Sequence, residues 1–495
     1  MLESTLTVPQ RGEAPALAPG SQLLEEVLQE SGVAIGDESS QVLQEGLARF
    51  VRWILSSPTI SRVDAVAVDA LIAELDQLLS DQINAIMHAP AFQAMESAWR
   101  GLKYVVESFD FRENVRLEML DLRKDELIAD LEDAPELVKT GYYRTIYSEG
   151  VGVFGGVPVG AICMTYDFVH GPQDQELLKK AAAVSAMAHA PLLANASPSF
   201  FGARSFEEVA HLKDLRSVFE SSVYATWSAF RDTEDARYVG LCAPRFVLRV
   251  PYGEETVPVK SFNFNEEAGG KSEHYLWAPA SLAMLTRLAD SFARYRWCPN
   301  IVGPKGGGLV ESLPLHHFKA LGEIQTKCPV EVMLTQRRAF ELAEEGFIPL
   351  EFEKDTNRAC FFSAGSTQRP KSFGISAEGK QAEANFRLGT QLPYIFIASR
   401  MAHYLKVIMN NEIGTYKERS DLQRELDRWI SQYVVSMENP DPITRARRPL
   451  REAKVVVEDV EGQPGWYRCG IQIRPHMQLV GVDLTLSLVS KLEKK

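Results

Sequence analysis

Cysteine, long apolar runs and positive charge are all scarce in this sequence. Its six cysteines include no Cys-x-x-Cys pair, which fits a reducing compartment and predicts no structural disulfide. The best apolar run, 392–398, falls far short of the roughly 18 residues of a membrane-spanning helix, so no membrane insertion is expected. With 53 Lys and Arg against 66 Asp and Glu, the net charge of −13 argues against a nucleic-acid binder.

The composition is otherwise that of a large globular protein. The 495 residues are 45% hydrophobic and 24% charged, which excludes a mostly disordered chain, a collagen and a coiled-coil rod. This length accommodates about three domains or fewer large ones. The first 20 residues lack the basic start and the apolar core of a signal peptide, so we expect a cytoplasmic protein.

The N-terminal region reads as a flexible arm followed by a short amphipathic helix. Residues 1–20 carry three prolines and no periodic apolar face. After a potential N-cap at Ser21, one apolar stripe is formed by Leu23, Leu24, Val27 and Leu28. A helix this short is marginal in isolation, so its apolar face is expected to need a partner.

Helical periodicity covers residues 40–109, with one apolar stripe at 43, 47, 50, 51 and 54 and another at 71, 75, 78 and 79. Further helices are predicted at 176–193, 215–230, 282–295 and 422–434. Strands are predicted at 115–119, 159–168 and 246–250. This mixture favours an α+β, multi-domain fold, divided as 1–38, 39–112, 113–375 and 376–495.

The last forty residues change to the two-residue period of strands. The alternating positions are Val455 and Val457 in the first run, Tyr467, Cys469, Ile471 and Ile473 in the second, and Leu484, Leu486 and Leu488 in the third. They predict a C-terminal antiparallel β-meander of three strands. The meander either closes a domain or exposes an edge that accepts a strand from another chain, for which the N-terminal segment is a natural donor.

No motif predicts catalysis, a cofactor or a metal. The run Gly150–Gly155 has the spacing G-x-G-x-x-G, but dinucleotide binding also needs a preceding strand and a helix that opens at the last glycine. The loop Gly303–Gly308 lacks the lysine and hydroxyl residue that follow the last glycine of a phosphate loop. Glu208 and His211 make only half of a carboxylate-bridged metal site.

The densest basic cluster lies before the meander, at Arg445, Arg447, Arg448 and Arg451. Four arginines in an acidic chain are too few for nucleic acid. Either they pair internally with nearby carboxylates or they form an interface with an acidic surface of a partner protein. Bidentate guanidinium bonds suit both interpretations.

Several long motifs occur in order along the chain. The first are Phe154-Gly155-Gly156-x-Pro158, His189-Ala190-Pro191, Phe201-Gly202-Ala203-Arg204-Ser205-Phe206 and Tyr238-Val239-Gly240-Leu241. The later ones are Tyr295-Arg296-Trp297-Cys298-Pro299-Asn300, Leu392-Pro393-Tyr394, Ala402-His403-Tyr404-Leu405-Lys406, Arg448-Pro449-Leu450-Arg451, Pro464-Gly465-Trp466-Tyr467 and Arg474-Pro475-His476. From about residue 40 to its end, the chain resembles the large sheath subunits of bacterial type VI secretion systems, the TssC/VipB family. Val157 and Val159 depart from its usual pattern.

The resemblance implies a contractile-tail-sheath-like core that does mechanical work without catalysis and without a cofactor. The implied partners are the small sheath subunit TssB/VipA, further copies of the same chain, the Hcp inner tube and a membrane-anchored baseplate. It also implies recycling by ClpV, a AAA+ unfoldase that grips an N-terminal helix. The stripe of Leu23, Leu24, Val27 and Leu28 would be its recognition element.

Two alternatives are left open by the sequence. One is a sheath protein of another contractile injection system, which would assemble without a second sheath chain. The other is a mixed α/β enzyme that uses the glycine-rich 150–160 turn. Co-expression with a small partner, followed by electron microscopy, would separate them.

Overall fold

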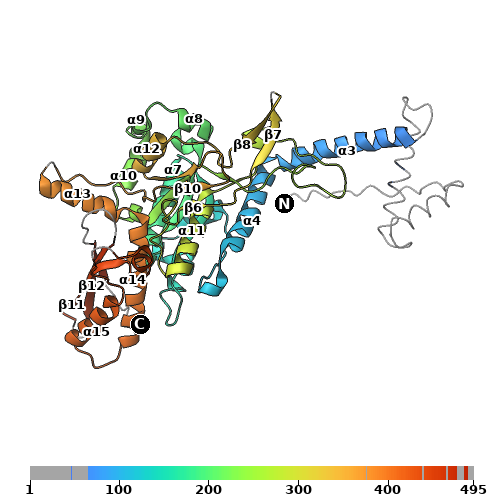
Figure 1. The fold of residues 1–495 in the computed structure, drawn as a ribbon. Helices are drawn as coiled ribbons and strands as arrows, with labels where there is room; N and C mark the ends of the chain where they lie inside the picture. The colour runs from blue at the N-terminus through green and yellow to red at the C-terminus, as the bar shows by residue number, and fades with distance from the viewer. Residues whose placement is uncertain are drawn as a thin grey trace, which may run out of the picture. The chain divides into compact units, whose positions relative to one another are not determined.

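The computed structural model describes residues 46, 49, 65–320, 322–374, 376–437, 440–463, 466–476 and 484–488 (Figure 1). The chain divides into two compact units, Met1–Ile83 with Lys260–Phe264 and Asn84–Val259 with Asn265–Lys495. The predicted N-terminal arm and its helix lie outside the described residues. Within the described ranges, no helix combines the length and the apolarity that a membrane span needs.

Two long helices confirm the helical prediction over the described part of residues 40–109. They are α3 (Ala65–Met87) and α4 (Pro90–Ser108). Helix α4 buries Gly101 and Val105. A Cβ atom at Gly101 would lie 2.6 Å from Leu282 Cδ1, so this glycine lets α4 approach α11 (Ala280–Tyr295) closely without moving that side chain.

A six-stranded sheet forms the centre of the larger unit, with the order β1-β2-β3-β9-β10-β6. Its strands are β1 (Ile162–Phe168), β2 (Leu192–Ala196), β3 (Val239–Ala243), β9 (Phe347–Phe352), β10 (Ala359–Phe361) and β6 (Leu309–Val310). The first four pair in parallel, and β10 is antiparallel to both of its neighbours. All residues of β2 and β3 are buried, as expected of parallel strands that are covered on both faces.

The two faces of the sheet carry separate hydrophobic cores. On β2, Leu192 and Ala194 belong to one core, while Leu193 between them belongs to the other. On β3, Leu241 and Cys242 divide in the same way. This alternation is the two-residue period of a strand, here apolar on both sides.

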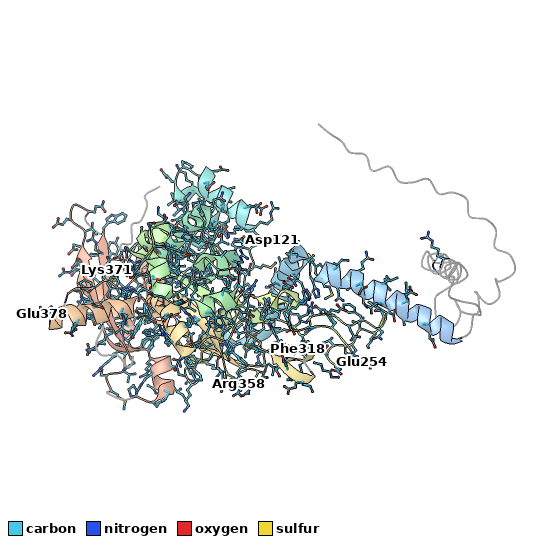
Figure 2. All side chains as sticks on the ribbon, turned by 90° about the horizontal axis from the view of Figure 1, so that it is seen from above. Asp121, Glu254, Phe318, Arg358, Lys371 and Glu378 are labelled. Atoms are coloured by element: carbon cyan, nitrogen blue, oxygen red, sulfur yellow. The ribbon has the colours of Figure 1, made fainter. Side chains whose placement is uncertain are left out.

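Short helices and small two-stranded sheets surround the sheet. The helices are α5 (Lys124–Asp133), α6 (Gly141–Tyr143), α7 (Pro172–Ala188), α8 (Phe206–His211), α9 (Leu215–Phe219), α10 (Ala225–Arg231) and α12 (Gln336–Glu344). The single-turn elements are η1 (Phe111–Glu113), η2 (Leu137–Lys139), η3 (Arg144–Ser148), η4 (Pro198–Phe201), η5 (Ser222–Tyr224), η6 (Asp235–Tyr238) and η7 (Ser272–His274). One two-stranded sheet pairs β4 (Phe246–Val247) with β5 (Trp277–Ala278), and a hairpin pairs β7 (His316–Ala320) with β8 (Glu323–Lys327). In Figure 2, Arg358, Lys371 and Glu378 lie at the periphery of this unit.

Three predicted elements are corrected by the structure. Residues 115–119 form no strand, because their alternating apolar side chains find no neighbouring strand, and Met119 is 63% exposed. The helix predicted at 176–193 ends at Ala188, where His189 adopts a left-handed φ of 51°, and the apolar residues after it form β2. The helix predicted at 215–230 is divided into α9, η5 and α10.

The C-terminal part contains four helices and the meander, which lie together at one end of the larger unit (Figure 1). The helices are α13 (Ala377–Gly389), α14 (Leu392–Glu412), α15 (Arg419–Ser431) and α16 (Pro442–Arg447). The strands are β11 (Leu450–Asp459), β12 (Tyr467–Pro475) and β13 (Leu484–Leu488), in that spatial order and antiparallel. The predicted meander is confirmed. The helix predicted at 422–434 is confirmed as α15, but it ends at Ser431, and Val434 forms a bridge with Leu450 instead.

Candidate functional site

The meander is packed on one face by α14 and α15. Cys469, Ile471 and Ile473 of β12 are buried, with at most 4% exposure, in a core that also contains Leu426 of α15 and Met401 of α14. Tyr467 is partly buried against the same core. The sequence-predicted apolar face of β12 therefore holds its own domain together.

The backbone of β12 is occupied on both sides. Ile471 lies opposite Val455 of β11 and opposite Leu486 of β13, and Ile473 lies opposite Leu484. A strand from another chain can therefore pair only with an outer edge of this sheet, on β11 or on β13.

The outer edge of β11 is covered near its middle by α15. The Val455 N–H donates to Asp427 Oδ1 over 3.3 Å, and the Val455 carbonyl accepts from Gln423 Nε2 over 3.3 Å. At the start of β11, Leu450 pairs with the segment around Val434. Side chains and a neighbouring segment thus satisfy polar groups that an added strand would need.

The same contacts determine which backbone N–H groups of β13 face away from β12. Because both polar groups of Val455 point away from β12, Val455 and Ile471 form a non-hydrogen-bonded pair. Alternation then turns the polar groups of Ile471 toward β13, where Leu486 lies opposite. The N–H groups of Thr485 and Ser487 therefore point to the outer edge, which no strand of the described residues occupies.

The four arginines of the basic cluster lie on α16 and the start of β11. Arg447 and Arg448 are exposed, whereas Arg445 and Arg451 are half-buried. Arg445 Nε donates to the Pro440 carbonyl over 2.9 Å. Within the part of the chain that the structure describes, none of the four has an Asp or Glu oxygen within 4.0 Å.

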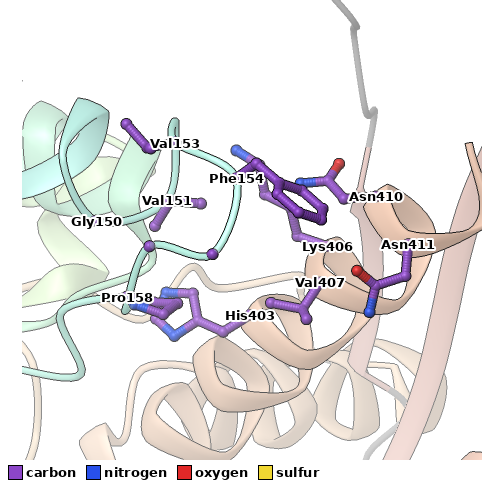
Figure 3. Close-up of a pocket in the computed structure, with 12 residues that line it drawn as sticks. Gly150, Val151, Val153, Phe154, Pro158, His403, Lys406, Val407, Asn410 and Asn411 are labelled. Atoms are coloured by element: carbon purple, nitrogen blue, oxygen red, sulfur yellow. The ribbon is translucent and has the colours of Figure 1, made fainter.

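Residues of four sequence motifs lie close together, namely the 150–158 turn, His189, Tyr238 and the 402–406 stretch of α14. Figure 3 shows the turn beside α14. His403 Nε2 donates to the Ala188 carbonyl over 2.8 Å, and His189 Nδ1 lies 3.1 Å from the Tyr238 hydroxyl. Lys406 Nζ donates to the Tyr147 hydroxyl over 2.6 Å and lies 4.5 Å from the centre of its ring. Sequence reasoning noted these motifs separately, and only the fold brings them together.

Both histidines of this cluster are neutral at ordinary pH. Burial, assisted by the positive charge of Lys406, lowers the pKa of His189 to about 4. Burial also lowers the pKa of His403 to about 4. The neutral ring of His403 therefore links α14 to the end of α7, and the neutral ring of His189 links that end to Tyr238 of η6.

The cavity beside them is too small for a nucleotide. It measures about 100 Å³, whereas ligand sites usually hold about 300 Å³ or more. The element order is also wrong for dinucleotide binding, since the η3 turn precedes Gly150 and β1 follows the run. Two exposed apolar side chains, Val153 and Phe154, line the cavity instead, at 57% and 82% exposure.

The Gly303–Gly308 loop is a packed turn. The Gly303 N–H donates to the Phe361 carbonyl over 2.8 Å, and the Phe361 N–H donates to the Gly308 carbonyl over 3.0 Å. A Cβ atom on Gly308 would lie 2.6 Å from the Phe361 oxygen. The glycines let the loop close over β10.

The remaining candidate residues have other placements. His211 Nδ1 lies 2.7 Å from the carbonyl oxygen of Glu207, one turn earlier on α8. In the described ranges, no three His, Cys, Asp or Glu side chains gather in a metal-binding arrangement. Leu23, Leu24, Val27 and Leu28 lie outside the described residues.

Sequence reasoning missed the two side chains that cover β11, Gln423 and Asp427. The available signal was their spacing of four residues on one polar face of the 422–434 helix. It also missed Arg231, which is 2% exposed and bonds Glu345 over 2.5 Å. A charged residue in a helix gives no indication in the sequence that it will be buried.

Comparison with known proteins identifies the class to which this architecture belongs. The family profile VipB, described as "EvpB/VC_A0108, tail sheath N-terminal domain", matches residues 69–368, and VipB_2, described as "EvpB/VC_A0108, tail sheath gpW/gp25-like domain", matches residues 381–492. The chain belongs to this family of tail sheath proteins.

A curated relative is similar along nearly the whole chain. The type VI secretion system sheath protein TssC1 of Pseudomonas aeruginosa is 39% identical over 466 residues, which covers 92% of both chains. Among solved structures, the anti-feeding prophage baseplate matches with a TM-score of 0.35 and 10% identity over 77% of this chain and 84% of that one. The contracted anti-feeding prophage sheath matches with a TM-score of 0.28 and 12% identity over 62% and 65%.

Proposed function

We propose that this chain is the large structural subunit of a type VI secretion contractile sheath. The 39% identity to a type VI secretion sheath protein over 92% of the chain is the observation that carries the proposal. In this function the chain pairs with the small sheath subunit and polymerises as a helical sheath around the Hcp tube. Contraction on the baseplate then propels the tube and its spike, and no chemical reaction is needed.

Contraction requires that the same subunits pack in two ways, with the extended packing higher in free energy and held by the baseplate. Each subunit contributes a modest difference, and the differences add along the sheath. Rigid bodies must rotate past one another while the polymer stays connected. A flexible strand shared between neighbours meets that requirement.

We propose that this linkage lies at the meander. The sequence-based proposal involved Tyr467, Cys469, Ile471, Ile473, Leu484 and Leu486. The outer position of β13 among the described strands supports its outer edge as the acceptor. An N-terminal segment of a neighbouring copy would pair there first, and a strand of the small subunit would extend the sheet further. The β11 edge is a poorer acceptor because α15 already bonds Val455.

The basic cluster serves as the second proposed interface. Arg445, Arg447, Arg448 and Arg451 would bind an acidic surface of a partner, and the Hcp tube is our candidate for it. Their lack of carboxylate partners within the described residues supports a contact outside the chain.

Recycling is proposed to act on the N-terminal region. The stripe of Leu23, Leu24, Val27 and Leu28 would enter an apolar groove of ClpV in the cytoplasm. If the stripe is covered in the extended sheath and uncovered after contraction, the unfoldase would select spent sheaths.

Co-expression with the small sheath subunit and negative-stain electron microscopy test the function. Long hollow tubes that need both chains are expected. Tubes formed by this chain alone would instead indicate another type of contractile machine. A monomer that never polymerises beside the small subunit would contradict the proposal.

A further inference from the structure

Helix α3 carries an apolar stripe on its surface. Ile72, Leu75, Leu78 and Leu79 are exposed at 44%, 39%, 57% and 41%. Single exposed leucines are common, but four large apolar side chains within two or three turns mark an interaction surface. Another face of the same helix is already packed, since Ser80 and Asn84 are buried.

The stripe has the spacing of a coiled-coil seam. Positions 72, 75 and 79 follow the three-then-four pattern of a and d positions in a heptad. Leu78 falls at the neighbouring g position, so the stripe is the a, d and g face that a packed helix buries against a partner.

The sequence before α3 contains a matching stripe. Leu43, Leu47, Phe50 and Ile54 have the four-three-four spacing of the same repeat. Gly46 and Arg49, the two described residues of this stretch, are helical and exposed. A single antiparallel register brings all four into contact with α3, as the pairs 43 with 79, 47 with 75, 50 with 72 and 54 with 68. In each pair an a position faces a d position.

Chain length and charge agree with this pairing. Residues 55–64 connect the two segments and can span about 33 Å, whereas packed helices lie about 8–10 Å apart. They contain Pro58 and three serines, which suit a loop. Residues 42–54 have a net charge of +1, while α3 has four acidic residues and no basic one. The two segments therefore attract each other.

We propose that residues 42–54 pack as an antiparallel helix on the Ile72–Leu79 stripe of their own chain. The resulting helical hairpin covers the apolar surface of α3. It also sets where the preceding arm leaves the molecule, beside residue 80. The pairing is intramolecular, so it forms at any protein concentration and with or without the small sheath subunit.

Disulfide trapping in the full chain tests this register. The variant Leu47→Cys with Leu75→Cys places two thiols across the proposed seam, and Leu47→Cys with Glu74→Cys is the matched control on the adjacent, outward position. We expect the seam pair to form a monomeric, faster-migrating species at least about tenfold faster than the control, because a disulfide needs Cα atoms about 4.4–6.8 Å apart. Equal rates would overturn the proposal. So would a disulfide-linked dimer, or loss of the cross-link when the small subunit binds, since another chain would then cover α3.

Hydrogen exchange on the full chain gives an independent readout. Amides of residues 43–54 should be protected in the wild type and should exchange at least about tenfold faster in Leu75→Asp, because a buried charge opens the hairpin. Ala73→Asp, outside the seam, should keep the protection. Fast exchange of 43–54 in the wild type, or an equal effect of both variants, would refute the hairpin.

Discussion

The open edge of β13 leads to a quantitative prediction with Ser487→Pro. Proline removes the outward N–H of residue 487, which would donate to an incoming strand, and leaves the ladder to β12 intact. A lost hydrogen bond costs about 1 kcal/mol, and the unsatisfied carbonyl on the incoming strand costs about 1–3 kcal/mol more. Each junction should then weaken by about 2–4 kcal/mol, or about 30- to 700-fold.

The assay compares three chains, each co-expressed with the small subunit. Sedimentation and electron microscopy should show intact sheaths for the wild type and few or none for Ser487→Pro, although the melting temperature of the isolated chain is unchanged. Leu486→Pro is the control, because the N–H of residue 486 faces β12 and its loss should lower the melting temperature. Normal sheaths from Ser487→Pro would refute the assignment of the linkage to this edge.

Three further outcomes are expected. The double variant Arg447→Ala with Arg448→Ala should leave the melting temperature unchanged and weaken sheath assembly. The reason is that these exposed side chains lack a carboxylate partner among the described residues. Sedimentation at increasing salt measures the loss of assembly. Arg231→Ala should destabilise the fold by about 3–5 kcal/mol in urea unfolding, because Glu345 loses its buried partner. Burial lowers the folded-state pKa of His189 and His403 from 6.5 to about 4, so the unfolded state takes up more protons below pH 6.5. Stability should fall by about 2 kcal/mol per histidine from pH 8 to pH 5, and His403→Gln should flatten that slope.

Each of these outcomes has a matched control. Arg474→Ala removes a cation that pairs with Glu452 on the same sheet, so an equal loss of assembly would contradict a special role for the cluster. Arg237→Ala breaks a pair with the exposed Glu234 and should cost about 1 kcal/mol or less. His211→Gln changes an exposed histidine and should leave the pH slope unaltered.

The meander and the 422–434 helix could be predicted because each follows one period over its whole length. Cys469, Ile471 and Ile473 alternate with polar residues since only one face of β12 meets the core. The end of the helix was harder to predict in the stretch 176–193. There the apolar residues of α7 are followed closely by those of β2, and a strand that is covered on both faces has no polar alternation to distinguish it from a buried helix.

The functional site depends on contacts that no local pattern contains. Val455 has the same alternation as Val457, but only the packing of α15 against β11 shows that its polar groups are occupied. Similarly, His189 and His403 are 214 positions apart and come within 6.3 Å, between ring centres, through the fold. Residues that lie far apart in sequence give no joint signal in a single chain.

The packing of α15 on the β11 edge limits how many strands the meander can bind. A sheet with two free edges could bind two strands independently, and its polymers could branch. Because Asp427 and Gln423 bond the β11 edge, the proposed N-terminal segment of a neighbouring copy would pair with the β13 edge alone. Such a contact joins two different surfaces, so its repetition along a helix would give the polymer a polarity.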